Sequence, residues 1–372
     1  MTAPLQSPAQ QRLQQIELAR RAVMLEGRSA TDMLVDSWFE RSWIERSWQR
    51  CLASGQRPDQ HLAFDMVPEA ARRRVLEASQ HLVQAARPVL DRLGRAIAST
   101  RYFAILTNHE GVVIDAHGPI DRADRRADLI TRTGVDLSER SVGTTAIGAA
   151  LTELQPVWLH RGEHFFADNA AYSCAGAPLF GPDGRCVGML DLTGIDAVER
   201  PELKHLVAQS ARSIENALTL ARPHSLLVRL NWPGLALGDD GDGLLCLDAD
   251  GWVTGSNGAA RAMMSQLLRP GTVVHCSELF AQPWEQLFDA ASAAAPAEVL
   301  EVPLWSGLRL QALALTPGGA PARAAPPRRM PLKDVEIALI RKAVDQARGN
   351  VSQAALALGI SRATVYRKLA QK

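Results

Sequence analysis

The chain has 372 residues, of which 47% are hydrophobic and 22% charged, an ordinary balance for folded protein that excludes wholesale disorder. At roughly 100 to 200 residues per domain, this length predicts two to four domains. The net charge is +1, but residues 321–372 hold eleven basic and three acidic side chains, so this end carries +8 and the preceding 320 residues carry −7. A basic end on an acidic body is expected when one end meets phosphates.

The first 98 residues predict a helical region. They are rich in Arg, Gln, Leu and Ala, and residues 67–93 show helical periodicity. Trp38, Trp43 and Trp48 follow one another at five-residue steps. Five residues advance a helix by about 500°, so the three rings cannot share one narrow stripe. Core packing on two faces is therefore favoured over a ligand cage for these tryptophans.

Residues 99–222 predict an α+β domain. Residues 102–118 show two apolar, β-rich runs around an Asn-His-Glu-Gly turn, which is typical of a hairpin. A second hairpin is predicted over 174–192, where Asp183-Gly184 suits the positive φ of a tight turn. Residues 201–221 then read as an amphipathic helix opened by proline.

A second α+β unit is predicted over residues 226–316. Residues 243–257 read as strand, Asp-Gly turn and strand, and helical segments follow at 259–268 and 279–292. Residues 301–315 alternate as strands do. The Pro, Gly and Ala content of residues 317–331 indicates a tether, because such a composition builds no core.

Residues 332–372 predict three short helices. Apolar side chains at 3, 4, 3 spacing over residues 337–347 line one face of the first helix. Asn350 suits the N-cap of a second helix, Gly359 a tight turn, and Ser361 the N-cap of a third helix. The third helix has four basic residues and no acidic one, so this unit predicts a helix-turn-helix that binds double-stranded DNA. A small docking or dimerisation bundle is the alternative.

The start of the third helix is expected to approach base edges. Arg362 suits guanine, and Ala363 or Thr364 suits a thymine methyl group. Tyr366, Arg367 and Lys368 are better placed for phosphates. The predicted DNA-binding residues are Asn350, Ser361, Arg362, Ala363, Thr364, Tyr366, Arg367 and Lys368.

Two parts of the chain resemble known families. GNVSQAALALGISRATVYRKL resembles the Fis-type helix-turn-helix that ends many sigma-54-dependent activators. IERSWQRCLASG, ERSVGTTAIGAAL, PVWLHRGEHFF and CAGAPLFGPDGRCVGMLDLTG resemble the sensor half of the acetoin-catabolism regulator family. This resemblance implies a helical N-terminal region and a GAF domain, and LLCLDADGWVTGSNGAA resembles the start of a PAS-like domain.

The sequence departs from this family in two ways. Thr145 stands where the family pattern usually has Asn. Full-length members also carry a central AAA+ ATPase, but no G-x-x-x-x-G-K-[ST] phosphate loop occurs in these residues. We therefore expect neither ATP hydrolysis nor opening of sigma-54 promoter complexes.

The resemblance places a candidate effector pocket in the GAF segment. Its expected ligand-binding residues are His164, Phe165, Tyr172 and Cys174, although core packing explains each about as well. His160 and His164 are four residues apart, but they lie in a strand or loop, so a metal site is disfavoured. The five cysteines are dispersed and include no C-x-x-C pair, which indicates neither a disulfide framework nor a zinc site. We expect no cofactor.

The sequence thus predicts a multidomain α+β regulator with a helical N-terminal region (1–98), a GAF sensor (99–222), a PAS-like domain (226–316), a linker (317–331) and a Fis-type helix-turn-helix (332–372). No membrane-spanning run, signal peptide or catalytic motif is found, so we expect a cytoplasmic, noncatalytic protein. Its expected partners are DNA, a small-molecule effector, a second copy of the chain, and RNA polymerase or a full-length related activator. The alternatives are an adaptor that pairs with such an activator, and a sensor enzyme.

Overall fold

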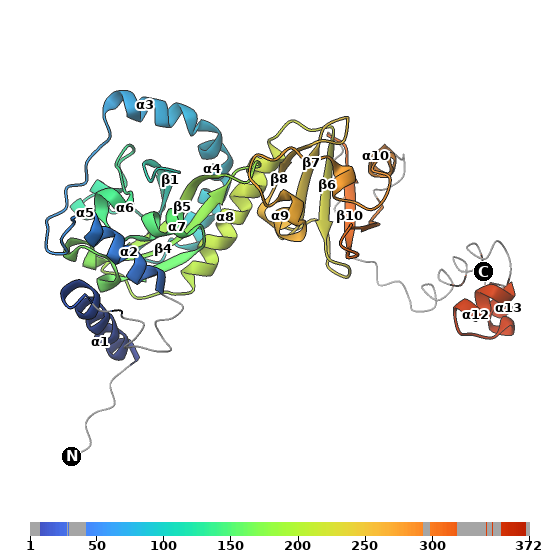
Figure 1. Ribbon diagram of the computed structural model, residues 1–372, viewed down its shortest axis with the longest axis horizontal. Helices are drawn as coiled ribbons and strands as arrows, with labels where there is room; N and C mark the ends of the chain where they lie inside the picture. The colour runs from blue at the N-terminus through green and yellow to red at the C-terminus, as the bar shows by residue number, and fades with distance from the viewer. Residues whose placement is uncertain are drawn as a thin grey trace, which may run out of the picture. The chain divides into compact units, whose positions relative to one another are not determined.

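The computed structural model describes residues 8–27, 29, 42–292, 298–317, 340, 344 and 351–369. The chain forms two compact units, residues 1–319 and residues 320–372. The first unit contains two five-stranded antiparallel sheets with helices packed on them (Figure 1), so the predicted mixture of helices and sheets is confirmed. Within the described ranges, no helix is long and apolar enough to cross a membrane.

The first sheet has the strand order β2-β1-β5-β4-β3. Both predicted hairpins are confirmed, because β1 pairs with β2 and β4 pairs with β5, in each case antiparallel. Alternate residues of β1 enter different hydrophobic clusters, with Phe103 and Ile105 on one face and Ala104 and Leu106 on the other. Both faces of this sheet are therefore covered. The strands are β1 (Tyr102–Asn108), β2 (Val113–His117), β3 (Val157–His160), β4 (Tyr172–Phe180) and β5 (Cys186–Ile195).

Helices cover the two faces of the first sheet unequally. One face packs against the two long helices α4 (Gln80–Ala96) and α8 (Leu203–Leu220), so the helix predicted over 201–221 is confirmed. The other face is covered by shorter helices (Figure 1). They include α2 (Ser42–Ala53), α5 (Arg125–Ile130), α6 (Glu139–Val142) and α7 (Ala146–Glu153).

The helices before residue 98 do not stand apart from this sheet, since α2 and α4 pack on opposite faces of it. Trp43 and Trp48 are buried in the core beside α2, which confirms core packing for these two rings, while Trp38 lies outside the described residues. The remaining elements of this region are α1 (Pro8–Arg20), the π-helical turn η1 (Arg21–Leu25) and α3 (Glu69–Ala78).

The second sheet has the order β8-β7-β6-β10-β9. The predicted strand-turn-strand over 243–257 and the two strands over 301–315 are confirmed. The helix predicted over 279–292 begins only at Glu285, because Pro283 and the bridge between Phe280 and Leu304 hold the preceding residues extended. The strands are β6 (Leu226–Asn231), β7 (Gly243–Leu247), β8 (Val253–Ser256), β9 (Leu300–Pro303) and β10 (Arg309–Leu315), and the helices are α9 (Gly258–Met263), η5 (Ser265–Leu267), η6 (Cys276–Glu278) and α10 (Glu285–Ser292).

Helix α8 makes hydrogen bonds to both sheet domains. Its Asn216 accepts a hydrogen bond of 2.7 Å from Asn257 Nδ2, the side chain that also caps α9. Its Glu215 accepts from the backbone N–H of Phe180 at 3.0 Å, and Thr219 offers its carbonyl to Cys246 Sγ at 3.4 Å. Buried hydrogen bonds of this kind fix the relative position of the packed elements.

The described part of the second unit contains α12 (Val351–Ala357) and α13 (Arg362–Leu369). Ile340, Ala355 and Val365 form its buried core. Gly359 lies between the helices at φ +64°, the left-handed conformation that favours glycine. Apart from Ile340 and Val344, the predicted first helix lies outside the described residues.

Candidate functional site

A cavity lies between the first sheet and helices α5, α6 and α7. Its volume is about 30 Å³, enough for about two water molecules. The lining is mostly aliphatic, with a polar group on each side. The sheet contributes Ile105, Cys174, Asp191 and Thr193, and the helices and their connections contribute Ile130, Val142, Thr145, Ala146, Ile147, His164 and Asn169.

The polar groups on the sheet side form a short chain. Cys174 Sγ and Thr193 Oγ1 are 3.4 Å apart, and Thr193 Oγ1 donates to Asp191 Oδ2. Asp191 is fully buried, and this burial raises the pKa of its carboxyl to about 7 despite the threonine hydrogen bond. Its other oxygen, Oδ1, has no hydrogen-bond partner within the described part of the chain.

His164 also lines the cavity, from the segment that follows β3. Its Nδ1 is 2.8 Å from the carbonyl oxygen of Arg161, and its ring meets Tyr172 edge to face at 6.4 Å between centroids. Burial lowers the pKa of His164 to about 4, and the nearby Arg20 charge acts in the same direction. Its Nε2 is likewise buried without a partner among the residues described.

Three of the four predicted effector residues line this cavity, namely His164, Tyr172 and Cys174. Phe165 does not line it, since its ring is fully buried against Phe166 at 5.0 Å between centroids. Sequence reasoning also missed Asp191, Thr193 and Asn169 as lining residues. The available signal was Asp191 itself, a carboxylate within an otherwise apolar strand.

The connection from α6 to α7 forms another wall of the cavity. Gly143 has φ +67°, and a Cβ there would lie 2.8 Å from the ring of Phe166. Thr145 caps α7 by accepting a hydrogen bond of 3.2 Å from the N–H of Gly148. Threonine therefore supplies the N-cap acceptor that the more usual asparagine would supply, so this departure from the family pattern leaves the local structure intact.

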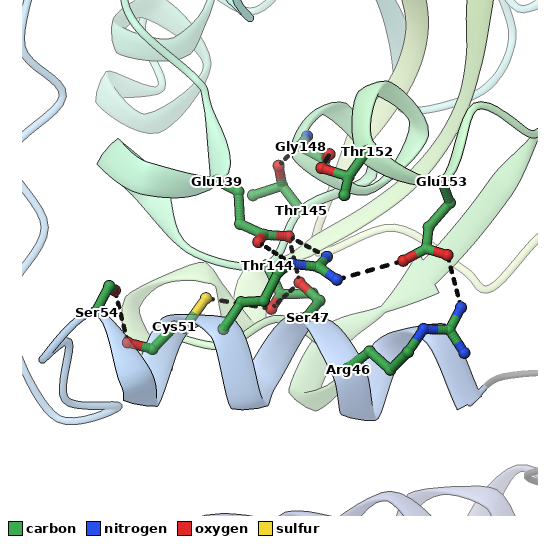
Figure 2. A network of polar contacts seen from close by, with 11 residues as sticks. Arg46, Ser47, Cys51, Ser54, Glu139, Thr144, Thr145, Gly148, Thr152 and Glu153 are labelled. Carbon is green, nitrogen blue, oxygen red and sulfur yellow. Dashed lines mark hydrogen bonds and ion pairs between the residues drawn. The ribbon is translucent and has the colours of Figure 1, made fainter.

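The outer side of this connection is bonded to α2 (Figure 2). Arg50 makes a bidentate ion pair with Glu139, with Nε–Oε1 at 2.7 Å and NH2–Oε2 at 2.9 Å. Ser47 Oγ donates to the same carboxylate at 2.6 Å and lies 2.7 Å from Thr144 Oγ1. The family motifs IERSWQRCLASG and ERSVGTTAIGAAL thus meet in one network beside the cavity.

The His164 side of the cavity is also held by N-terminal helices. Arg20 of α1 donates to the carbonyls of Gly162, His164 and Phe165. Trp48 of α2 donates through Nε1 to the carbonyl of Glu163 at 2.9 Å. Helices α1 and α2 together therefore hold both the His164 segment and the α6–α7 connection.

His160 and His164 do not converge on a common point. His160 Nδ1 lies 2.6 Å from Ser173 Oγ, whereas His164 Nδ1 meets the Arg161 carbonyl. Within the part of the chain that the structure describes, no group of three or more His, Cys, Asp or Glu side chains is placed to hold a metal ion.

The structure describes the side chains of four of the predicted DNA-binding residues. Ser361 and Arg362 are exposed at the start of α13, and Thr364 and Lys368 are half-buried. Ser361 Oγ accepts from the N–H of Thr364 at 3.1 Å, which confirms the predicted N-cap. Asn350 lies outside the described residues, as do the side chains of Ala363, Tyr366 and Arg367.

Removing this cap is expected to weaken the recognition helix. Ser361→Ala should lower the free energy of unfolding of the C-terminal unit by about 1 kcal/mol, because the Thr364 N–H loses its acceptor. Ser361→Asp should restore it, since aspartate caps as well as serine. Amide hydrogen exchange at residues 362–365 measures the change, and equal exchange in wild type and Ser361→Ala would contradict it.

Comparison with known proteins gives the family. A family model described as MimR, N-terminal domain, matches residues 29–216, which is half of the chain. The chain belongs to this family. A second model, described as bacterial regulatory protein, Fis family, matches residues 331–371 of this MimR-type chain. The resemblance to acetoin-catabolism regulators and the Fis-type helix-turn-helix are both confirmed.

Curated relatives of this MimR-family chain are regulators of transcription. The acetoin catabolism regulatory protein of Cupriavidus necator is 29% identical over 73% of this chain and 40% of its own length. The propane 2-monooxygenase operon transcriptional activator MimR of Mycolicibacterium goodii is 30% identical over 37% of this chain and 24% of its own. The chain thus spans less than half the length of these relatives. They are regulators rather than enzymes, as predicted for this chain.

One solved structure covers most of the chain at low likeness. It is the complex of DhaR(N) with DhaL from E. coli, 15% identical, covering 74% of this chain and 99% of that one with a TM-score of 0.45.

Proposed function

We propose that this chain is a DNA-binding transcription regulator that senses a small molecule in the cavity of its first sheet domain. In this proposal residues 99–222 form a GAF sensor, residues 226–316 a PAS-like domain, residues 317–331 a linker, and residues 332–372 the DNA-binding domain. The single observation that carries sensing is a cavity with two lining residues that each have an unpartnered buried atom, His164 Nε2 and Asp191 Oδ1.

The cavity supports sensing because buried polar groups normally have partners. Leaving such a group unpaired costs about 1–3 kcal/mol, so two unpaired atoms on residues that line one cavity favour an occupant that satisfies them. The His164 segment is bonded to α1 and α2, and α6 is bonded to α2, so an occupant that moves either of these walls can act on the N-terminal helices. In this proposal α2 responds when the α6–α7 connection moves.

The DNA-binding part rests on the second unit. Its recognition helix, α13, is capped by Ser361 and begins with the exposed Arg362, and it carries no acidic side chain. One such module reads only a few base pairs, so the proposed active form is a homodimer on two half-sites about one helical turn apart. RNA polymerase or a full-length related activator is the proposed further partner.

The proposed output does not use ATP. No phosphate-loop motif occurs in the 372 residues, and the region between the first sheet and the helix-turn-helix is occupied by the second sheet. The regulator is therefore proposed to act by occupying DNA or by contacting a partner, without ATPase activity.

Fluorescence anisotropy on DNA from the gene's own upstream region tests the proposal. Wild type should bind specifically, and Arg362→Ala should weaken specific binding by about 1–3 kcal/mol if its guanidinium contacts a guanine. Arg309→Ala is the matched control, because Arg309 is an exposed arginine of the second sheet. Its affinity for DNA should equal that of wild type.

Two salt concentrations separate specific from nonspecific binding. Binding of wild type and Arg362→Ala that is equally weak and is erased by salt would reject sequence reading. The tail would then serve to pair with a related activator, which is the adaptor function.

A further inference from the structure

The two unpartnered atoms of the cavity have definable hydrogen-bonding roles. A carbonyl oxygen only accepts, so the 2.8 Å contact of His164 Nδ1 with the Arg161 carbonyl places the ring proton on Nδ1. A neutral imidazole carries one ring proton, and burial favours the neutral ring. His164 Nε2 is therefore a lone-pair acceptor, and an occupant must bring a donor to it.

Asp191 favours an uncharged group in the cavity. Asp191 lines the cavity, and its Oδ2 accepts from Thr193, which leaves Oδ1 as the unpartnered oxygen. Protonated Asp191 would donate from Oδ1, and ionised Asp191 would accept there. An anion meets Coulombic repulsion from the ionised form, whereas an uncharged group does not, and the lining itself holds no Lys or Arg to pair with an anion.

We infer that Asp191 and His164 are the specificity-determining contacts of the effector, with His164 Nε2 accepting from an effector hydroxyl and Asp191 excluding anions. This inference rests on the proposed sensing function. It assigns the aliphatic lining, which includes Ile105, Val142 and Ile147, to the effector's alkyl part. The 30 Å³ cavity limits the occupant to a few heavy atoms unless the α6–α7 wall moves outward.

Three probes on a three-carbon skeleton separate the two contacts. Propane-1,2-diol is uncharged and brings hydroxyl donors, acetone is uncharged without a donor, and lactate has a donor but is an anion. Ligand-observed NMR titration of the full chain at pH 8, above the pKa of about 7 that burial gives the Asp191 carboxyl, yields their dissociation constants. Wild type should bind propane-1,2-diol about tenfold more tightly than acetone, because acetone leaves one buried acceptor unpaired. Lactate should bind at least tenfold more weakly than the diol.

Variants assign each preference to its residue. His164→Phe keeps a ring against Tyr172 but removes the acceptor, so diol and acetone should bind equally. At pH 8 Asp191→Asn removes the negative charge that repels lactate, so the ratio of the lactate dissociation constant to that of the diol should fall. Asp115→Asn is the matched control, since this carboxylate lies on β2 outside the cavity lining, and it should retain the wild-type order.

Each other result overturns the inference. Lactate binding wild type as tightly as the diol would remove the anion exclusion, and an unchanged diol preference in His164→Phe would remove the histidine contact. Binding of none of the three probes would leave a cavity filled by water. The same preparations are also tested for DNA binding. If they bind DNA specifically and Arg362→Ala abolishes this binding, the regulator function stands even when the inference about the cavity fails. If the probe selectivity is as expected but specific DNA binding is absent, only the regulator function is rejected.

Discussion

Between pH 7 and pH 4, the stability of Asp191→Asn relative to wild type will fall by about 1.4 kcal/mol for each unit by which the pH is lowered. The cause is the burial of Asp191, which raises the pKa of its carboxyl from 3.8 in the unfolded chain to about 7 in the folded one. The folded state then binds the proton more tightly. The contribution of the Asp191 carboxyl to stability is fully present below pH 3.8 and is lost as the pH rises through 7. Asp191→Asn has no such contribution.

His164 acts in the opposite direction. Burial lowers the pKa of its ring from 6.5 to about 4, so the unfolded chain binds the proton more tightly. Stability from this group is present above pH 6.5 and is lost as the pH falls through 4. The two contributions offset each other in wild type between pH 4 and pH 6.5. His164→Phe removes one of them, so its stability relative to wild type should rise as the pH falls.

Urea unfolding followed by tryptophan fluorescence at half-unit pH steps measures both slopes. Differences between each variant and wild type remove the titration of all other groups, including the exposed carboxylates paired with arginine, whose pKa values are lowered. Asp115→Asn serves as the control, because this carboxylate lies on β2 outside the cavity lining. Parallel pH profiles for wild type and both cavity variants would mean that neither side chain is buried as the structure has it.

Turns and helix caps could be predicted from short sequence patterns. The β4–β5 hairpin could be predicted because Asp183-Gly184 suits a tight turn between two apolar runs. Ser361 and Gly359 could be assigned because cap and turn conformations select particular residues. In each case the deciding interaction joins residues that are close in the sequence.

Contacts between distant residues could not be predicted in this way. Arg50 and Glu139 are 89 positions apart, and nothing in either helix indicates the other. The resemblance placed Phe165 in the pocket, but its ring packs against Phe166 instead. The direction of this side chain depends on the path of the loop, which the sequence pattern does not give. Asp191 was overlooked because periodicity records it only as one polar residue in a buried strand.

Trp48→Ala is expected to cost about 3–5 kcal/mol of unfolding free energy, the range for removing a large buried aromatic side chain. Trp48 is fully buried, and its Nε1 donates to the Glu163 carbonyl beside His164. Trp48→Phe keeps most of the buried ring and removes only that donor. It should cost about 1–3 kcal/mol, because the buried carbonyl loses the hydrogen bond from the indole.

The urea midpoint measures the global loss, and amide hydrogen exchange over residues 160–166 measures the local one. Trp43→Ala is the matched control, since Trp43 is buried in the same core and its indole donates no hydrogen bond to residues 160–166. If α2 holds the His164 wall through the indole, Trp48→Phe will speed exchange in residues 160–166 more than Trp43→Ala does at equal global stability. If the two variants at matched stability show the same exchange, Trp48 only fills the core, and the link from α2 to the cavity would have to run through Glu139.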